Sequence, residues 1–198
     1  MEAEYFLSLV NGQRGHFLYE SGYHSDMWLD LETICSRPDA IRPAILELSK
    51  EIAKWKPEVI CGPLIEGGFI GLLTAIELGV SFVYAVRHPN APDSRLFPVS
   101  YELPAAVKPV VCGKRVVVVN DVISAGSAVR GSLESLKQCG ANVVGISCFA
   151  VLGEIFCKYA EQEAVPFNAL LKMPNNMWEP EICPLCAAKI ALQRLATH

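Results

Sequence analysis

The 198-residue sequence has no apolar run long enough to cross a bilayer. A membrane-spanning helix needs roughly 20 consecutive apolar residues, and no uninterrupted hydrophobic stretch here reaches that length. The N-terminus, MEAEYFLSLV, is acidic before a short apolar stretch, whereas a secretory signal begins with basic residues. We therefore expect a soluble, cytoplasmic protein.

A concentration of positive charge is also missing. Lys and Arg number 17 against 21 Asp and Glu, which gives a net charge of −4, and the basic residues are scattered. This balance argues against a nucleic-acid partner. It is compatible with a small anionic ligand, because backbone N–H groups at a helix start bind phosphate without net positive charge.

Low-complexity tracts and internal repeats are absent as well. The composition is 52% hydrophobic and 19% charged, which excludes an intrinsically disordered chain. The length suits one domain with one core. Within it we expect an N-terminal element at 1–35, a core at 36–172 and an irregular, proline-rich tail at 173–198 that wraps the surface or a partner subunit.

The eight cysteines do not resemble a disulfide framework. Several lie in strand-like runs such as VICGP and GISCFAV, which is typical of buried free thiols in a reducing compartment. Only Cys183 and Cys186, in CPLC, have the spacing of two zinc ligands. Zinc normally takes four ligands, and no second pair lies nearby in the sequence. A tight proline-containing turn is therefore the competing interpretation.

Hydrophobic periodicity predicts alternating helices and strands. Strands are expected at 58–62, 81–87, 114–121 and 142–151, helices at 3–10, 36–55, 67–79 and 125–138, and two short strands within 16–32 around a Ser21-Gly22 turn. The 36–55 helix has Ser36 or Asp39 as its candidate cap, and Pro38 and Pro43 suit only its first turn or a boundary. This alternation predicts an α/β, doubly wound fold with a mainly parallel sheet.

Two segments interrupt that pattern. Residues 87–113 contain five prolines and little periodicity, which in a compact domain indicates a lid, a hairpin or a binding loop. The tail from Met173 is similarly irregular.

The stretch VVVVNDVISAGSAVRG, residues 116–131, carries the clearest chemistry. Ligands of open parallel sheets bind beyond the carboxyl ends of the strands, where Asn120 and Asp121 are expected. The small residues that follow let backbone N–H groups approach a phosphate, and Asp121 suits sugar hydroxyls or a metal ion. The competing interpretation is a structural turn with an acidic helix cap. Neither Gly-Lys-Ser/Thr nor the G-x-G-x-x-G fingerprint is present.

The same stretch resembles the 5-phosphoribosyl-1-pyrophosphate (PRPP) motif of type I phosphoribosyltransferases, and it is most similar to the version found in orotate phosphoribosyltransferases. HFLYESGYHSDMWLDLE resembles the N-terminal Ser-Gly-x-x-Ser element of that group, and CGPLIEGG resembles its pyrophosphate loop. The resemblance covers roughly residues 1–172, and WEPEICPLC is similar to tails of some orotate-type relatives.

The resemblance implies a site for PRPP and a nitrogenous base, with Mg²⁺ bound through PRPP near Asp121. It assigns 5-phosphate binding to Ser124, Ala125, Gly126, Ser127 and Ala128. The pyrophosphate loop would comprise Gly62, Pro63, Leu64, Ile65, Glu66 and Gly67. The candidate catalytic residues are Asp121, Asn120, Arg87 and His88, the last at the start of a lid at 88–100. Base-side candidates are Glu20, Ser21, His24, Ser25 and Trp28, although a strand Trp is more commonly a core residue. The family also implies a homodimer that pairs near the pyrophosphate loop, where the 67–78 helix is very apolar.

Three departures keep two functions open. Asn120 replaces the first acid of the family's pair, and Arg95 is the only other cation in the lid after Arg87 and His88. Glu20 stands where the family has a lysine and Leu152 about where it has an arginine, which argues for a neutral or cationic acceptor rather than orotate. The chain is then either a phosphoribosyltransferase for an undetermined base or a PRPP-binding protein of the same fold that has lost transfer activity.

Overall fold

The computed structural model describes residues 3–89 and 96–195. Its main sheet is built from β3 (Val59–Pro63), β4 (Ser81–Pro89), β5 (Val99–Glu102), β6 (Arg115–Ile123), β7 (Asn142–Leu152) and β8 (Phe167–Met173). These lie in the order β5-β4-β3-β6-β7-β8. All neighbours are parallel except β5, which pairs antiparallel with β4 at one edge. The four predicted strands are therefore all present, and the sheet is mainly parallel as expected.

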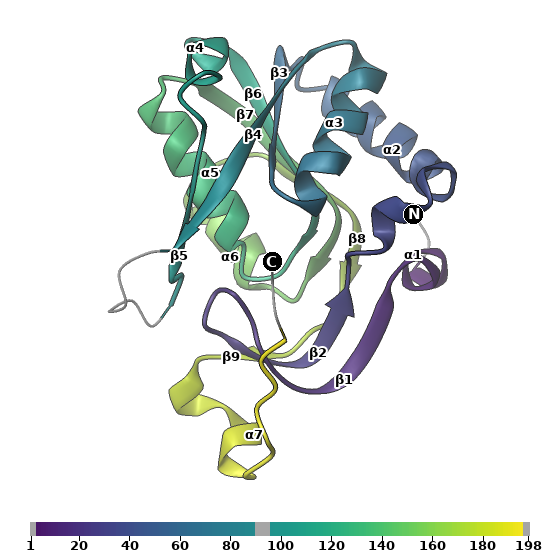
Figure 1. Cartoon of the computed structure of the whole chain (residues 1–198), viewed down its shortest axis with the longest axis vertical. Coiled ribbons are helices and arrows are strands. Elements are labelled where there is room, and N and C mark those ends of the chain that lie inside the picture. The colour runs from purple at the N-terminus through teal and green to yellow at the C-terminus, as the bar shows by residue number, and fades with distance from the viewer. Residues whose placement is uncertain (1–2, 90–95, 196–198) are drawn as a thin grey trace.

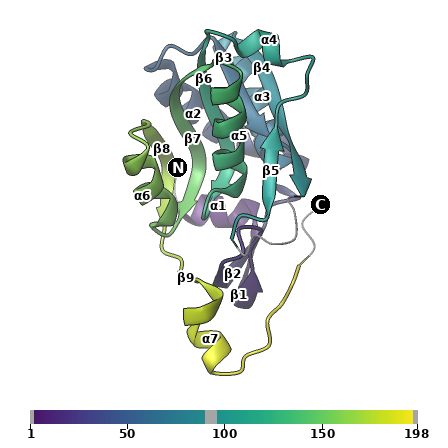
Figure 2. The same cartoon turned by 90° about the vertical axis from the view of Figure 1, so that its left-hand side faces the viewer.

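Helices cover both faces of this sheet (Figures 1 and 2). Helices α2 (Pro38–Ala53) and α3 (Glu66–Leu78) pack on one face, and α5 (Ser127–Gln138) and α6 (Ile155–Gln162) on the other. Strand β6 shows why its sequence is so apolar, because Val117 and Val119 face the first core and Val116 and Val118 the second. A strand buried on both faces has no polar side to alternate with. The doubly wound α/β prediction is confirmed.

The beginning of α2 differs from the prediction. Its N-cap is Arg37, without a side-chain capping bond, so neither Ser36 nor Asp39 caps it. Pro38 occupies the first helical turn as expected, whereas Pro43 lies inside the helix. Pro43 cannot donate the i→i−4 hydrogen bond of its turn, and burial of the apolar face, including Ile41, Ile45 and Leu48, stabilises the helix despite that loss.

The N-terminal residues form a small separate sheet, which we call the hood. After α1 (Ala3–Leu9), β1 (Asn11–Leu18) pairs antiparallel with β2 (His24–Asp30) across the predicted turn. A short strand from the tail, β9 (Met177–Trp178), adds to β2. The hood lies below the carboxyl ends of the large sheet in Figure 1. A 3-10 turn, η1 (Ile34–Ser36), then leads into α2.

The irregular segments contain more structure than their sequences indicate. Residues 87–113 include the hairpin of β4 and β5 and a short helix, α4 (Lys108–Val111). Positions 90–95 of the predicted lid lie outside the described residues. The tail forms β9, a 3-10 turn, η2 (Pro180–Ile182), and one helical turn, α7 (Pro184–Ala187). In the part of the chain that is described, no helix is long and apolar enough to span a bilayer.

Candidate active site

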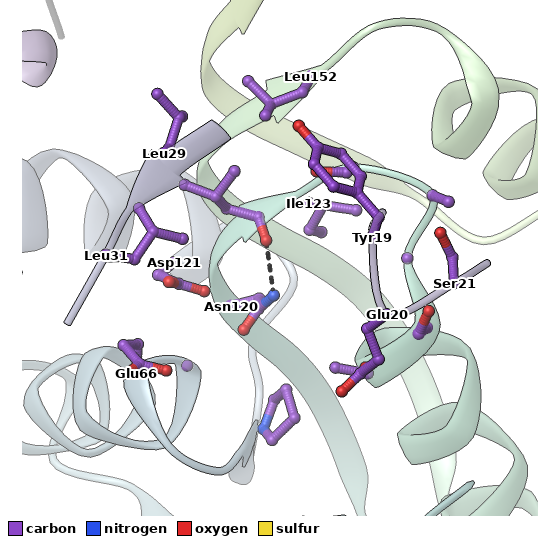
Figure 3. A pocket seen from close by; sticks show the side chains of 18 of the residues that line it. Tyr19, Glu20, Ser21, Leu29, Leu31, Glu66, Asn120, Asp121, Ile123 and Leu152 are labelled. Atoms are coloured by element: carbon purple, nitrogen blue, oxygen red, sulfur yellow. Dashed lines mark hydrogen bonds between the residues drawn. The ribbon is translucent and has the colours of Figure 1, made fainter. Parts of the chain in front are cut away.

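A cavity of about 530 Å³ lies between the hood and the carboxyl ends of β3 and β6 (Figure 3). This is the edge of an open α/β sheet at which ligands bind, and the volume suits a nucleotide-sized molecule. The hood closes the side of the cavity opposite the sheet. Residues far apart in the sequence therefore meet around one space.

Strand β6 delivers two polar side chains to this cavity. Asn120 and Asp121 are 8% and 5% exposed, and the Asn120 side-chain amide donates to the Val122 carbonyl at 2.9 Å. Burial raises the pKa of Asp121 to about 7, while backbone hydrogen bonds oppose the shift and the nearby Glu66 carboxylate reinforces it. Two acidic groups converging in a buried site favour the arrival of a cation.

The predicted phosphate loop follows directly, and all of its residues, Ser124, Ala125, Gly126, Ser127 and Ala128, line the cavity. Helix α5 begins at Ser127 rather than at the predicted 125, because Gly126 is its N-cap with φ of +86°. A side chain on Gly126 would also collide with the Phe156 ring. Glycine is thus required at the point where the loop turns into the first residue of α5.

Arg130 supports this loop from behind, a role that the sequence analysis missed. Its Nε donates to the Ala125 carbonyl at 3.0 Å, and its guanidinium stacks on Tyr159 and Phe97, 3.8 and 4.6 Å from the ring centroids. An arginine four residues into a helix has no distinctive sequence pattern. Only the fold brings both rings to it.

The predicted pyrophosphate loop forms the wall beside Asn120. Its residues Pro63, Leu64, Ile65, Glu66 and Gly67 line the cavity, whereas Gly62 lies behind them. The Leu64–Ile65 peptide bond is cis. Gly67 lies so close to Asn120 that a side chain on it would collide with the Asn120 amide. The predicted pyrophosphate loop therefore lies directly against the polar end of β6.

On the hood side, Glu20, Ser21 and Trp28 line the cavity. Glu20 accepts a 2.6 Å ionic hydrogen bond from Arg87 Nε, and the Tyr101 hydroxyl donates to it at 3.2 Å. The unexpected acid is therefore neutralised by the arginine predicted to be catalytic. Burial, together with Glu20, raises the pKa of Tyr101, so its hydroxyl stays a donor.

Five predicted residues do not line this cavity: Gly62, Arg87, His88, His24 and Ser25. His88 is exposed on β4. His24 is buried against His16 and the tail cysteines, and Ser25 hydrogen-bonds to Asn175 of the tail. His24 and Ser25 lie at the start of β2, where β9 of the tail pairs with it, so their side chains contact the tail rather than the cavity. His24 instead belongs to a separate cluster with His16, Cys183 and Cys186.

Several residues that the sequence analysis did not assign to the site also line it. They include aliphatic side chains and one phenol: Leu29, Leu31, Tyr19, Ile123 and Leu195 (Figure 3). Tyr19 donates to the Met27 carbonyl at 2.6 Å, and burial raises its pKa. Ile123 lies within the 116–131 stretch on β6, whereas Tyr19, Leu29 and Leu31 join the site only through the position of the hood.

Comparison with known proteins accounts for this arrangement. The family model described as a phosphoribosyl transferase domain matches residues 27–169. The chain belongs to the phosphoribosyltransferase family. Among curated relatives, the orotate phosphoribosyltransferase of Helicobacter pylori is 31% identical over 90% of both chains. That of Caldanaerobacter subterraneus is 29% identical over 94% of this chain and 90% of that protein.

Solved structures show the same fold. The orotate phosphoribosyltransferase of Aeropyrum pernix superposes with a TM-score of 0.65 at 21% identity, covering 87% of this chain and 94% of that one. The adenine phosphoribosyltransferase of Thermoanaerobacter pseudethanolicus gives 0.61 at 22% identity, covering 74% and 88%. This phosphoribosyltransferase therefore transfers the 5-phosphoribosyl group of PRPP to a nitrogenous base and releases pyrophosphate. Nothing in the comparisons favours a binding protein without activity.

Proposed function

We propose that this phosphoribosyltransferase acts on a base without a carboxylate, unlike the orotate named for its curated relatives. One observation carries the proposal: no Lys, Arg or His occurs among the described residues that line the cavity, whereas several of them are acidic. The acids are Glu20, Asp30, Glu32, Glu66 and Asp121. A carboxylate on the base would enter this field without a partner.

The nearest hood-side arginine does not change that balance. Arg87 is bound to Glu20 with 34% of its side chain exposed, so its charge is already matched. Breaking that pair for a substrate carboxylate would leave Glu20 uncompensated beside Tyr101. Discrimination by such a like-charge contact is the usual way in which a site rejects an anion.

The remaining surface suits the face of an uncharged ring. Leu29, Leu31 and Leu152 lie above Asp121 and Asn120 in Figure 3, with Tyr19 beside them. Leu152 occupies about the place where the related enzymes have an arginine, and it is 2% exposed. Trp28 packs near Tyr19 with ring centroids 6.0 Å apart and offers an aromatic edge to the same space. Aliphatic and aromatic walls with few polar groups bind neutral heterocycles.

For PRPP we propose the roles that the geometry supports. The amides and hydroxyls of Ser124–Ala128 hold the 5-phosphate. The Asp121 carboxylate accepts hydrogen bonds from the ribose hydroxyls, and the Asn120 amide donates to them. The Pro63–Gly67 loop faces pyrophosphate. Transfer breaks the bond from C1 to pyrophosphate and forms one to a ring nitrogen, through a cation-like sugar. The buried Asp121 carboxylate stabilises that positive charge, and the hood limits access of water.

Mg²⁺ is the metal that we propose for this reaction. The donor set fits it, because Asp121 and Glu66 place hard oxygen groups at the point where PRPP would bring its own oxygens. When bound, Mg²⁺ neutralises charge on the leaving pyrophosphate. Asn120 lacks the charge of the family's first acid, so we expect this site to rely on Asp121.

We also propose a homodimer that pairs through α3. Four large apolar side chains, Ile65, Phe69, Leu72 and Ile76, are 42–68% exposed, and their spacing places them on one helix face. Ile65 also lines the cavity, so this face continues into the pyrophosphate loop. A second copy of the chain is the occupant that fits a face of this kind beside the active site.

We propose that the protein is located in the cytoplasm, because its eight free cysteines suit a reducing compartment.

Pyrophosphate release tests the base preference. The enzyme is supplied with PRPP, Mg²⁺ and orotate, uracil, adenine or hypoxanthine in turn. We expect at least one uncharged base to exceed orotate in kcat/KM by about tenfold or more. Preference for orotate would overturn the choice of base but leave the family assignment intact. Saturable PRPP binding with no release from any base would instead support loss of transfer activity.

A substitution locates the preference in the cavity. Leu152→Arg restores a cation where the related enzymes have one, so we expect the ratio of orotate to uracil use to rise about tenfold. Leu195→Arg is the matched control, because it adds the same charge to a cavity residue outside the proposed base position. Equal effects of the two variants would show that net charge, rather than the position of Leu152, controls the preference.

A further inference from the structure

Four potential metal ligands meet where the tail packs against the hood. They are His16 on β1, His24 on β2, and Cys183 and Cys186 at α7. Their ligand atoms all lie within 4.8 Å of one another, and every residue but Cys186 is buried. No second pair of ligands lies near CPLC in the sequence, but the fold brings two histidines to it on β1 and β2 from more than 150 residues away.

The distances match a four-coordinate site. The two histidine nitrogens, His16 Nε2 and His24 Nδ1, are 3.0 Å apart, and Cys183 Sγ is 3.5 Å from His16 Nε2. Cys186 Sγ is 3.3 Å from His24 Nδ1 and 3.8 Å from His16 Nε2. Tetrahedral zinc with ordinary Zn–N and Zn–S bonds separates its ligand atoms by about 3.3–3.8 Å. To bind zinc, the two histidine nitrogens would need to move only slightly farther apart.

A neighbouring carbonyl orients one of the histidines for this role. His16 Nδ1 is 2.8 Å from the Ile190 carbonyl oxygen, which can only accept, so Nδ1 carries the proton. The lone pair of the other nitrogen, Nε2, is then directed at both cysteines. A histidine that donates its second N–H to a backbone carbonyl is the common outer arrangement of zinc ligands.

The tail has little else to hold it in place. Cys183 is the only buried residue in 174–195, so this segment has no apolar core of its own. It is attached by hydrogen bonds, among them Gln193 N to the His16 carbonyl at 2.7 Å, Leu18 N to the Gln193 carbonyl at 3.0 Å, and the side-chain bond from Ser25 to Asn175 at 3.0 Å. Small segments without a core are commonly stabilised by a metal.

We propose that His16, His24, Cys183 and Cys186 bind a structural zinc ion that fastens the tail to the hood. Four protein ligands close the coordination sphere, so the ion has no open position for catalysis. The two thiols lose their protons as the metal binds. The site is independent of the base preference proposed above. Its connection to the cavity is mechanical, because the tail leads from Gln193 to Leu195, which lines the cavity.

Metal analysis of the full-length protein tests the site. The chain is expressed with zinc in the medium and purified under reducing conditions. We expect about one zinc ion per chain, and less than about a tenth of that in Cys183→Ser and Cys186→Ser. Cys112→Ser is the control, because Cys112 is an exposed free thiol outside the cluster and should leave the zinc content unchanged. Cobalt added to the stripped protein should give the intense visible bands and sulfur charge transfer of a tetrahedral Cys₂His₂ site.

A second measurement separates loss of metal from loss of folding. Chelation of the wild-type protein should expose the tail to protease several-fold faster, and returning zinc should restore protection while the main sheet keeps its circular dichroism. The proposal is overturned if the reduced wild-type protein neither retains zinc nor develops cobalt bands. Zinc retained in full by both serine variants, or a Cys183–Cys186 disulfide in the freshly purified protein, would overturn it as well.

Discussion

The Asp121 carboxyl should make the free enzyme less stable as the pH rises toward neutrality. Burial raises its pKa from the ordinary 3.8 to about 7, so the folded protein holds a proton that the unfolded chain has lost. Between these two values the folded state binds more protons than the unfolded state, and the free energy of unfolding therefore falls as the pH increases. Above about pH 7 both states are ionised, and this group contributes no further loss.

The size of the effect follows from the shift. Three pKa units correspond to roughly 4 kcal/mol between pH 4 and pH 7, as an upper figure. Between pH 5 and pH 8 only the interval from pH 5 to pH 7, about two units, contributes, and it lowers the free energy of unfolding by roughly 3 kcal/mol. Asp121→Asn removes the titration and keeps an oxygen that accepts the backbone N–H bonds. From pH 5 to pH 8 the free energy of unfolding of the variant should therefore rise by about 3 kcal/mol relative to that of the wild type. The variant should also lose affinity for PRPP with Mg²⁺.

Urea unfolding at pH 5 and pH 8, without PRPP or metal, measures the difference. Glu102→Gln is the control, because it neutralises an exposed carboxyl on β5 and should leave the wild-type pH dependence nearly unchanged. A variant whose stability relative to wild type changes by less than about 0.5 kcal/mol between the two pH values would refute the buried, protonated carboxyl. Unchanged PRPP affinity in Asp121→Asn would instead remove Asp121 from the ribose site.

Three further substitutions test the loop and the helix surface. Gly126→Ala should destabilise the enzyme by more than the strain of φ +86° alone and should abolish PRPP binding, because the new side chain meets a ring of α6. Urea unfolding measures this loss of stability. Gly79→Ala is the control, because φ is +66° there and the space around the new side chain is open. Arg130→Lys should raise the KM for PRPP about tenfold with little change in fold, because lysine cannot donate to the phosphate-loop carbonyl and stack on two rings at once. Phe69→Glu should convert the enzyme to a monomer in light scattering, whereas Val110→Glu, also on an exposed apolar residue, should not; a dimer that survives Phe69→Glu would place the interface elsewhere.

The local sequence determined the elements and the two loops. Unbroken runs such as Val116–Val119 predict buried strands because a sheet covered on both faces leaves no polar side, and glycine was required at Gly126 for a turn that other residues rarely adopt. The parallel topology then places Asn120 beside Gly67, since the carboxyl ends of adjacent strands share an edge. These features depend on spacing along the chain, which a sequence shows directly.

Tertiary structure alone decided which distant residues meet. The pairing of Glu20 with Arg87 and the grouping of His16 with Cys186 depend on how the hood sits on the sheet and how the tail returns to it. No short spacing records such contacts, because the residues are 67 and 170 positions apart. The sequence therefore determined the loop for which we propose phosphate binding, whereas the fold decided the charge of the cavity and assembled the His-Cys cluster for which we propose zinc.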